Sequence, residues 1–156
     1  MLFPYCPVTQ AVLLDTTNYC PDLGTPLYDQ TVVLLGTVLA KTQAFAASGV
    51  PVRSVTLLIT DGADESSRRA TAPTVATLVG DMQQSEMHIV AAMGIDNGST
   101  DFRQVFHKMG LAAPWILTPG SGATDIRQAF RMFSQSAVAA SQGSGHFRQL
   151  GGFGTP

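Results

Sequence analysis

An aspartate that follows an apolar strand is the feature of this sequence best suited to chemistry. The run 55–60, Val-Thr-Leu-Leu-Ile-Thr, is almost continuously apolar or β-branched, and Asp61-Gly62 follows it directly. Such a run is typical of a central parallel strand that is covered on both faces. Because ligands of open α/β folds bind at the carboxyl edge of the sheet, Asp61 is a candidate ligand-binding carboxylate.

Other reactive side chains are spaced too far apart to form a recognisable site. The histidines are scattered among a predicted strand, a predicted helix and the C-terminal tail: His88, His107 and His146. This pattern indicates neither a transition-metal site nor a catalytic triad. Cys6 and Cys20 lack zinc or redox spacing, and the loop 94–98 lacks the Gly-Lys-Ser/Thr ending of a nucleotide-binding loop. We therefore expect no catalytic residues and no enzymatic activity.

Composition and charge describe one globular domain. The chain has 156 residues, of which 45% are hydrophobic and 13% charged, and a formal net charge of -2. This length is enough to bury a core, and the absence of a basic stripe argues against nucleic acid or an anionic membrane as the main partner. No secretory signal or membrane-spanning run is recognisable. We expect a cytoplasmic protein with two free thiols.

Apolar periodicity predicts alternating strands and helices. The predicted strands cover 10–14, 55–60, 87–93 and 115–117. The predicted helices run from Pro26 to a stop signal at 49–51, over 74–84, from a cap at Thr100 or Asp101 to Gly110, and over about 124–140. This alternation predicts a doubly wound α/β fold with a mostly parallel sheet and helices on both faces. Residues 1–140 are expected to form the domain, and residues 141–156, rich in Gly, Ser and Gln, a flexible tail.

A second polar turn makes the pattern more specific. The segment Gly24-Thr25-Pro26-Leu27-Tyr28-Asp29 opens the long helix, and Thr60-Asp61-Gly62 comes one helix later. Together they resemble the second and third metal-binding loops of a von Willebrand factor A (VWA) domain, and the resemblance covers about residues 10–140. It implies a partial VWA, Rossmann-like fold and a non-enzymatic protein-binding function through a metal-ion-dependent adhesion site (MIDAS). We expect a bacterial protein.

The resemblance also implies a ligand set. Thr25 would offer its hydroxyl and Asp61 its carboxylate to Mg²⁺, which prefers oxygen ligands in octahedral geometry. The Asp-x-Ser-x-Ser loop that supplies most other protein ligands in the family is missing, so we expect an incomplete, weak site. Residues 15–18 combine a carboxylate with hydroxyls, but their position favours an Asx-type turn. Thr25 as a helix N-cap and Asp61 as a loop cap stay open as alternatives.

Three further polar residues near these loops are assigned structural roles. Asp29, one turn into its helix, is expected to favour the helix N-terminus rather than to bind metal. Asp64 and Ser66 are interpreted as loop caps close enough to shape the site.

The missing first strand has a consequence for assembly. In the family it lies beside the strand that matches 55–60, so we expect one side of this strand to be open and to invite pairing with another chain. A longer native protein, a genuine remnant and a second polypeptide that completes the sheet all stay open as explanations. The expected partner is a protein of unknown identity, with self-association through the open edge. A metal-free α/β scaffold, or a small metal-dependent hydrolase or phosphotransfer enzyme that uses Asp61, is the alternative function.

Overall fold

The computed structural model describes residues 6–13, 15–18, 24–142 and 152–153. Its helices are α1 (Leu27–Ala47), α2 (Ala72–Gln84), α3 (Phe102–Lys108) and α4 (Ala123–Gln142), with 3-10 turns η1 (Val8–Gln10) and η2 (Ala113–Trp115). The strands are β1 (Ser54–Thr60), β2 (His88–Gly94) and β3 (Ile116–Leu117). Within the described residues, none of the helices combines the length and the apolarity needed to cross a lipid bilayer.

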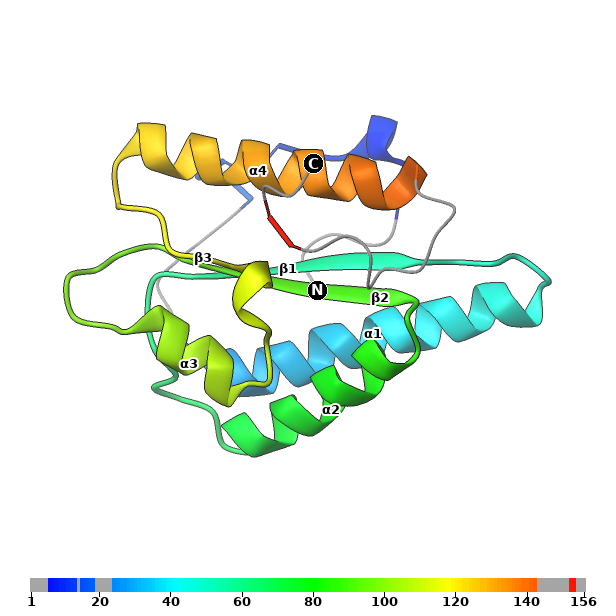
Figure 1. The fold of residues 1–156 in the computed structure, drawn as a ribbon, viewed down its shortest axis with the longest axis horizontal. Coiled ribbons are helices and arrows are strands. Elements are labelled where there is room, and N and C mark those ends of the chain that lie inside the picture. The colour runs from blue at the N-terminus through cyan, green and yellow to red at the C-terminus, as the bar shows by residue number, and fades with distance from the viewer. Residues whose placement is uncertain (1–5, 14, 19–23, 143–151, 154–156) are drawn as a thin grey trace.

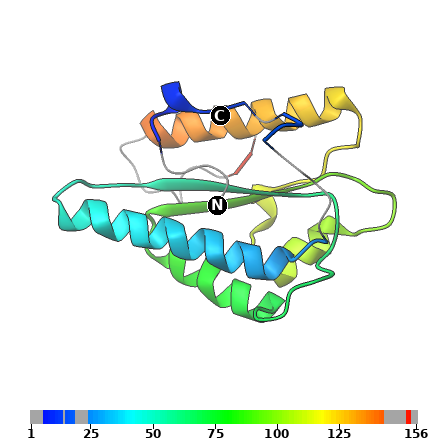
Figure 2. The same ribbon diagram turned by 180° about the vertical axis from the view of Figure 1, so that it is seen from behind.

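The described strands form one parallel sheet in the order β1-β2-β3. Ser54 pairs with His88 at one end of the β1–β2 ladder, and Thr60 pairs with Gly94 at the other. Helices α1, α2 and α3 lie against one face of the sheet, and α4 lies along the opposite face (Figures 1 and 2). The predicted α/β class, parallel strand arrangement and helices on both faces are confirmed.

The main core lies between the sheet and the layer formed by α1, α2 and α3. Leu35 of α1, Val75 of α2 and Phe106 of α3 are fully buried there and pack with Leu58 of β1. All seven residues of β2 are buried, which explains why its sequence is apolar without alternation. A smaller cluster lies on the α4 side, so both faces of the sheet contribute to stability.

The strand predicted over 10–14 is wrong over its described residues. Gln10 ends the 3-10 turn η1, and residues 11–13 are irregular and exposed, while Leu14 lies outside the described residues. Asn18 donates a side-chain hydrogen bond to the carbonyl of Leu13 at 2.9 Å. The segment therefore runs into a local turn, and among the described residues no strand lies beside it to favour an extended ladder.

Several element boundaries also differ from the prediction by one or two residues. Trp115 ends the turn η2 instead of beginning the strand, because Trp115 N donates to Ala112 O at 2.9 Å and closes that turn. Helix α4 continues to Gln142, two residues beyond its predicted end.

Two residues near the C-terminus are placed against the domain. Phe153 N donates to Pro114 O at 2.9 Å, and its ring lies 5.4 Å from that of Trp115 and 6.4 Å from that of Phe133. A β-carbon at Gly152 would lie 2.2 Å from Pro114 Cβ, so only glycine fits this approach. The rest of the predicted tail beyond Gln142 lies outside the described residues.

Candidate functional site

The segments that carry Thr25 and Asp61 touch at the carboxyl end of β1. Asp61 follows the last residue of the strand, and Thr25 lies two residues before α1. Thr25 Oγ1 lies 3.4 Å from the position of a β-carbon built on Gly62, the residue after Asp61. Glu65 N also donates to Thr25 O at 3.0 Å. The fold thus brings the two predicted site residues to the same edge of the sheet.

The oxygens of both side chains are available to a ligand. The Asp61 side chain is exposed and the Thr25 side chain is half-buried. Within the described part of the chain, neither the Thr25 hydroxyl nor the Asp61 carboxylate forms a hydrogen bond to another protein group. Pro26 occupies the N-cap position of α1, so Thr25 does not have the N-cap role considered above.

Asp64 satisfies the amino end of α1 from a separate loop. Its Oδ1 accepts from Tyr28 N at 3.2 Å and from the hydroxyl of Ser67. The first amides of a helix have no intrahelical partner and favour a nearby negative charge. The hydrogen bond from Ser67 agrees with the predicted loop-cap role of Asp64, and the hydrogen bond from Tyr28 N adds a contact to the first turn of α1 that the sequence did not predict.

Asp29 holds the same loop from the opposite direction. Its carboxylate accepts from the backbone amides of three successive residues: Arg68 at 2.9 Å, Arg69 at 3.0 Å and Ala70 at 2.6 Å. Asp29 N in turn donates to Ser67 Oγ at 3.0 Å. The sequence indicated that the Asp29 carboxylate acts on the N-terminus of its own helix. In the structure it binds a loop that is distant in sequence. Asp29 and Asp64 together fasten the loop after β1 to α1.

These contacts make the loop sensitive to acid. The hydrogen bonds from Arg68 N, Ala70 N and Arg69 N hold the pKa of Asp29 below its ordinary value. A carboxyl whose pKa is lowered on folding stabilises the protein at pH values above its unfolded pKa, about 3.9. That stability is lost as the pH falls from the unfolded pKa through the lower folded pKa. In this range the carboxyl is protonated more readily in the unfolded chain than in the folded chain, which favours unfolding.

Replacing Asp29 by asparagine should lower the midpoint of thermal unfolding at pH 7. Between pH 5 and pH 2 the midpoint of the variant should decrease less than that of the wild type. The amide keeps one acceptor oxygen but turns an NH₂ group toward backbone donors. Thermal unfolding followed by circular dichroism measures both effects. Asp101→Asn is the matched control, because Asp101 caps α3 through Gln104 N and asparagine is an equally good cap. Equal changes in the two variants would contradict the role given to Asp29.

The loops after all three strands are joined at this edge. Ile95 N donates to Thr60 O, and Asp96 N donates to Pro119 O, both at 2.9 Å. Asn97 Nδ2 donates to the carbonyl of Asp61 at 2.8 Å and fixes the backbone that carries the candidate ligand. Beyond β3 the edge continues into a cavity of about 280 Å³. A partner would therefore meet a connected surface, not a single mobile loop.

The oxygen ligands that the described residues can offer to a cation are few. Among these residues, no group of three or more His, Cys, Asp or Glu side chains is close enough to hold a metal ion. Asp29 and Asp64 already accept several hydrogen bonds each. Asp15 Oδ1 accepts from Thr17 N at 2.7 Å and from Thr17 Oγ1 at 2.6 Å, which confirms the predicted Asx-type turn. The predicted ligands are thus one hydroxyl, of Thr25, and one carboxylate, of Asp61, a set that fits a hard cation but leaves most positions to water.

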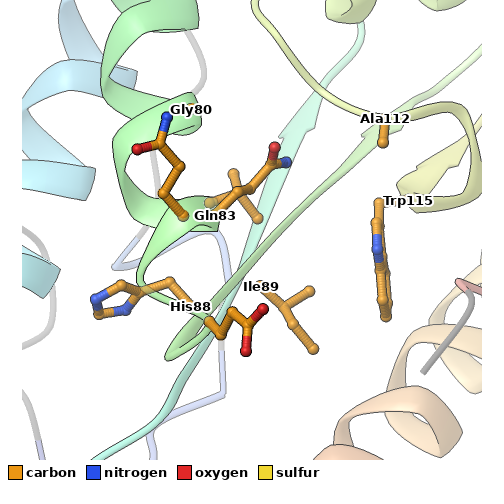
Figure 3. A pocket seen from close by; sticks show the side chains of 9 residues that line it. Gly80, Gln83, His88, Ile89, Ala112 and Trp115 are labelled. Carbon is orange, nitrogen blue, oxygen red and sulfur yellow. The ribbon is translucent and has the colours of Figure 1, made fainter. Parts of the chain in front are cut away.

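A different cavity lies at the amino end of the strands. It has a volume of about 410 Å³ and is lined by residues that include Gln83, His88 and Trp115. Figure 3 shows Trp115 on one side and His88 on the other, with the imidazole directed away from the indole. His88 Nδ1 shares a 2.7 Å hydrogen bond with Ser54 Oγ, and burial lowers the pKa of this histidine. His88 is thus a buried structural residue at the opposite end of the sheet from Asp61.

Comparison with known proteins gives no relative from which a role could be transferred. No protein-family model, no curated protein and no solved structure matches this chain. The resemblance to VWA domains therefore depends on the two loops and on their positions in the fold.

Proposed function

We propose that this chain is a cytoplasmic, non-enzymatic protein-binding module with a partial VWA fold. Its binding surface is the carboxyl edge of the sheet, where an incomplete metal-ion-dependent adhesion site consists of Thr25 and Asp61. The partner is a protein that presents an acidic group to this edge. The observation that carries the proposal is the approach of Thr25 Oγ1 to Gly62, because it brings the two loops of the motif together.

The arrangement of the surrounding loops supports this proposal. Asp29 and Asp64 fasten the loop after β1 onto α1, and Asn97 holds the carbonyl of Asp61. These contacts hold the backbone that carries the exposed Asp61 side chain. A binding surface benefits from such preorganisation, because less conformational entropy is lost when the partner arrives.

A Mg²⁺ ion held there would bridge the protein to an acidic group of the partner. With one hydroxyl and one carboxylate supplied by protein, the ion gains little over its water shell, which magnesium gives up reluctantly. Affinity for a partner would therefore come more from the loops and from the cavity beyond β3 than from the ion. Arg103 and Asp125 line that cavity and give it charges of both signs.

Calorimetric titration with Mg²⁺ tests the proposal. The wild-type chain should bind with a dissociation constant on the order of millimolar, and Asp61→Ala should abolish the signal. Asp81→Ala is the control, because Asp81 is an equally exposed carboxylate on α2 and should leave binding unchanged. Tight binding that Asp61→Ala removes would indicate further ligands, with Asp64 and Asp15 the first to test.

A metal-free scaffold is the second candidate, and one observation favours it. Within the described residues, no cluster of three metal-binding side chains surrounds Asp61. On this alternative the same carboxyl edge binds its partner through the loops alone. Absence of Mg²⁺ binding in both the wild-type and the Asp61→Ala chain would favour the scaffold.

A further inference from the structure

Within the part of the chain that the structure describes, the outer side of β1 is an open strand edge. Ser54 N donates to Met87 O and Thr60 O accepts from Ile95 N, both at 2.9 Å, so the even-numbered residues of β1 direct their backbone groups to β2. The backbone N–H and C=O groups of successive residues point to alternate sides of a strand. Those of the odd-numbered residues therefore point away from β2: Val55, Leu57 and Ile59. Within the described residues, no strand pairs with this side of β1.

Nothing in the sequence of β1 protects this edge. The strand contains no charged residue and no proline, and it pairs with β2 at all seven positions without a bulge. Natural edge strands are commonly protected from further pairing by charged residues, prolines or bulges. The side chain of Ile59 is also 47% exposed beside the edge. Open backbone groups and apolar surface together favour the addition of another strand.

We propose that two copies of this chain pair antiparallel along β1, with the twofold axis at Leu57. Leu57 then faces Leu57 of the second copy, and Val55 faces Ile59 at both ends. In antiparallel pairing, residues of a hydrogen-bonded pair exchange both of their N–H···O bonds. This register therefore satisfies every outward backbone group of β1 and covers the exposed side chain of Ile59.

Charge complementarity selects a second copy and this register. Arg53 lies four residues before Leu57, and Asp61 lies four residues after it. Arg53 and Asp61 flank β1, so pairing about Leu57 brings Arg53 toward Asp61 of the second copy at each end of the interface, where opposite charges attract. An axis at Thr56 would set Arg53 opposite Ile59, and an axis at Leu58 would set it opposite Ala63.

The net charge and the opposite edge of the sheet are also compatible with a closed dimer. The net charge of -2 per chain gives little repulsion between two copies. Strand β3, at the other side of the sheet, has only two residues and offers a poor template for a further strand. A twofold interface uses the same surface on both copies, so pairing through β1 leaves no open β1 edge for a third chain.

Sedimentation equilibrium of the full chain without Mg²⁺ tests the dimer separately from the metal site. The wild-type chain should be dimeric, and Ile59→Lys should raise the dissociation constant at least about tenfold, because a lysine would be buried in the interface. Thr77→Lys, on the exposed surface of α2, adds the same charge away from β1 and should leave the dimer intact. A monomeric wild type, or an Ile59→Lys chain that dimerises normally, would overturn the proposal.

The register has its own test. Arg53→Asp should weaken the dimer by setting two aspartates opposite each other, and Arg53→Asp combined with Asp61→Arg should restore it. Both variants change exposed positions, and because Arg53 also has an interaction within its own chain, circular dichroism verifies that they are folded. Failure of the double variant to recover dimerisation would overturn the axis at Leu57.

Discussion

Replacing Phe106 by alanine should lower the free energy of unfolding by about 3–5 kcal/mol. The side chain is fully buried on α3 and packs in the main core with Val75, Leu58 and Met109. Truncation removes apolar contacts and leaves a cavity that the surrounding helices can fill only in part. Chemical denaturation followed by circular dichroism measures the loss.

Phe130→Ala provides the matched control for this prediction. The same ring is deleted from α4, where Phe130 is 40% exposed. Its cost should stay within about 1 kcal/mol, because a surface substitution leaves no enclosed cavity. Equal losses in the two variants would show that the core does not lie between the sheet and α3.

Replacing Gly94 by alanine should cost about 3 kcal/mol or more, because the new methyl group overlaps the ring of Phe102. A β-carbon at Gly94 would lie 2.2 Å from Phe102 Cγ. Phe102 is itself buried at the start of α3, so either the helix or the strand must shift. The shift would reach the candidate site, since the loop between them carries Asn97, which donates to Asp61 O. Denaturation measures the stability, and proteolysis of the native state measures loosening of the loop.

Gly36→Ala should raise the free energy of unfolding, and it serves as the control for Gly94→Ala. Gly36 lies in the middle of α1, and a β-carbon there would meet no atom within 4 Å. Alanine in an exposed helix interior is more favourable than glycine by about 0.5–1 kcal/mol. Stabilisation by Gly36→Ala together with destabilisation by Gly94→Ala would locate the close approach at the end of β2.

The elements that sequence predicts best here are those whose burial is complete or strongly one-sided. Residues 89–93 are apolar without alternation because both faces of β2 are buried, whereas β1 buries Thr56, Leu58 and Thr60 on one face and leaves Ile59 exposed on the other. The run 10–14 is also apolar, yet its described residues form no strand. Apolar sequence favours a strand only where a neighbour can complete the ladder, and this neighbour is not visible in a local window.

The candidate site was predictable in its position but not in its internal contacts. Asp61 and Thr25 could be placed at one edge because an apolar strand and a helix start mark their neighbourhoods. The role of Asp29 was missed because its hydrogen-bond partners, Arg68 to Ala70, lie about forty residues away. Every residue except proline has a backbone N–H, so the types of residues 68–70 do not reveal that their amides bind Asp29.

The site and the proposed dimer share one residue, which links the two proposals. Asp61 is the candidate metal ligand, and it also lies opposite Arg53 of a second copy in the Leu57 register. A surface ion pair of this kind contributes only about 0–1 kcal/mol. Mg²⁺ should therefore reduce dimer affinity only slightly, while the backbone pairing along β1 persists.

Backbone amide NMR during a Mg²⁺ titration shows where a weakly bound ion lies, and it therefore tests whether the ion binds at the carboxyl edge of the sheet. The amides of Thr25, Asp61 and Gly62 should shift progressively, in fast exchange, while those of His88 and Trp115 at the other end of the sheet stay unchanged. Calcium-free buffer and an Asp61→Ala sample complete the experiment. Shifts centred on the Asp15 turn, or no shift at Thr25 and Asp61 at millimolar Mg²⁺, would contradict a metal-assisted site at the carboxyl edge.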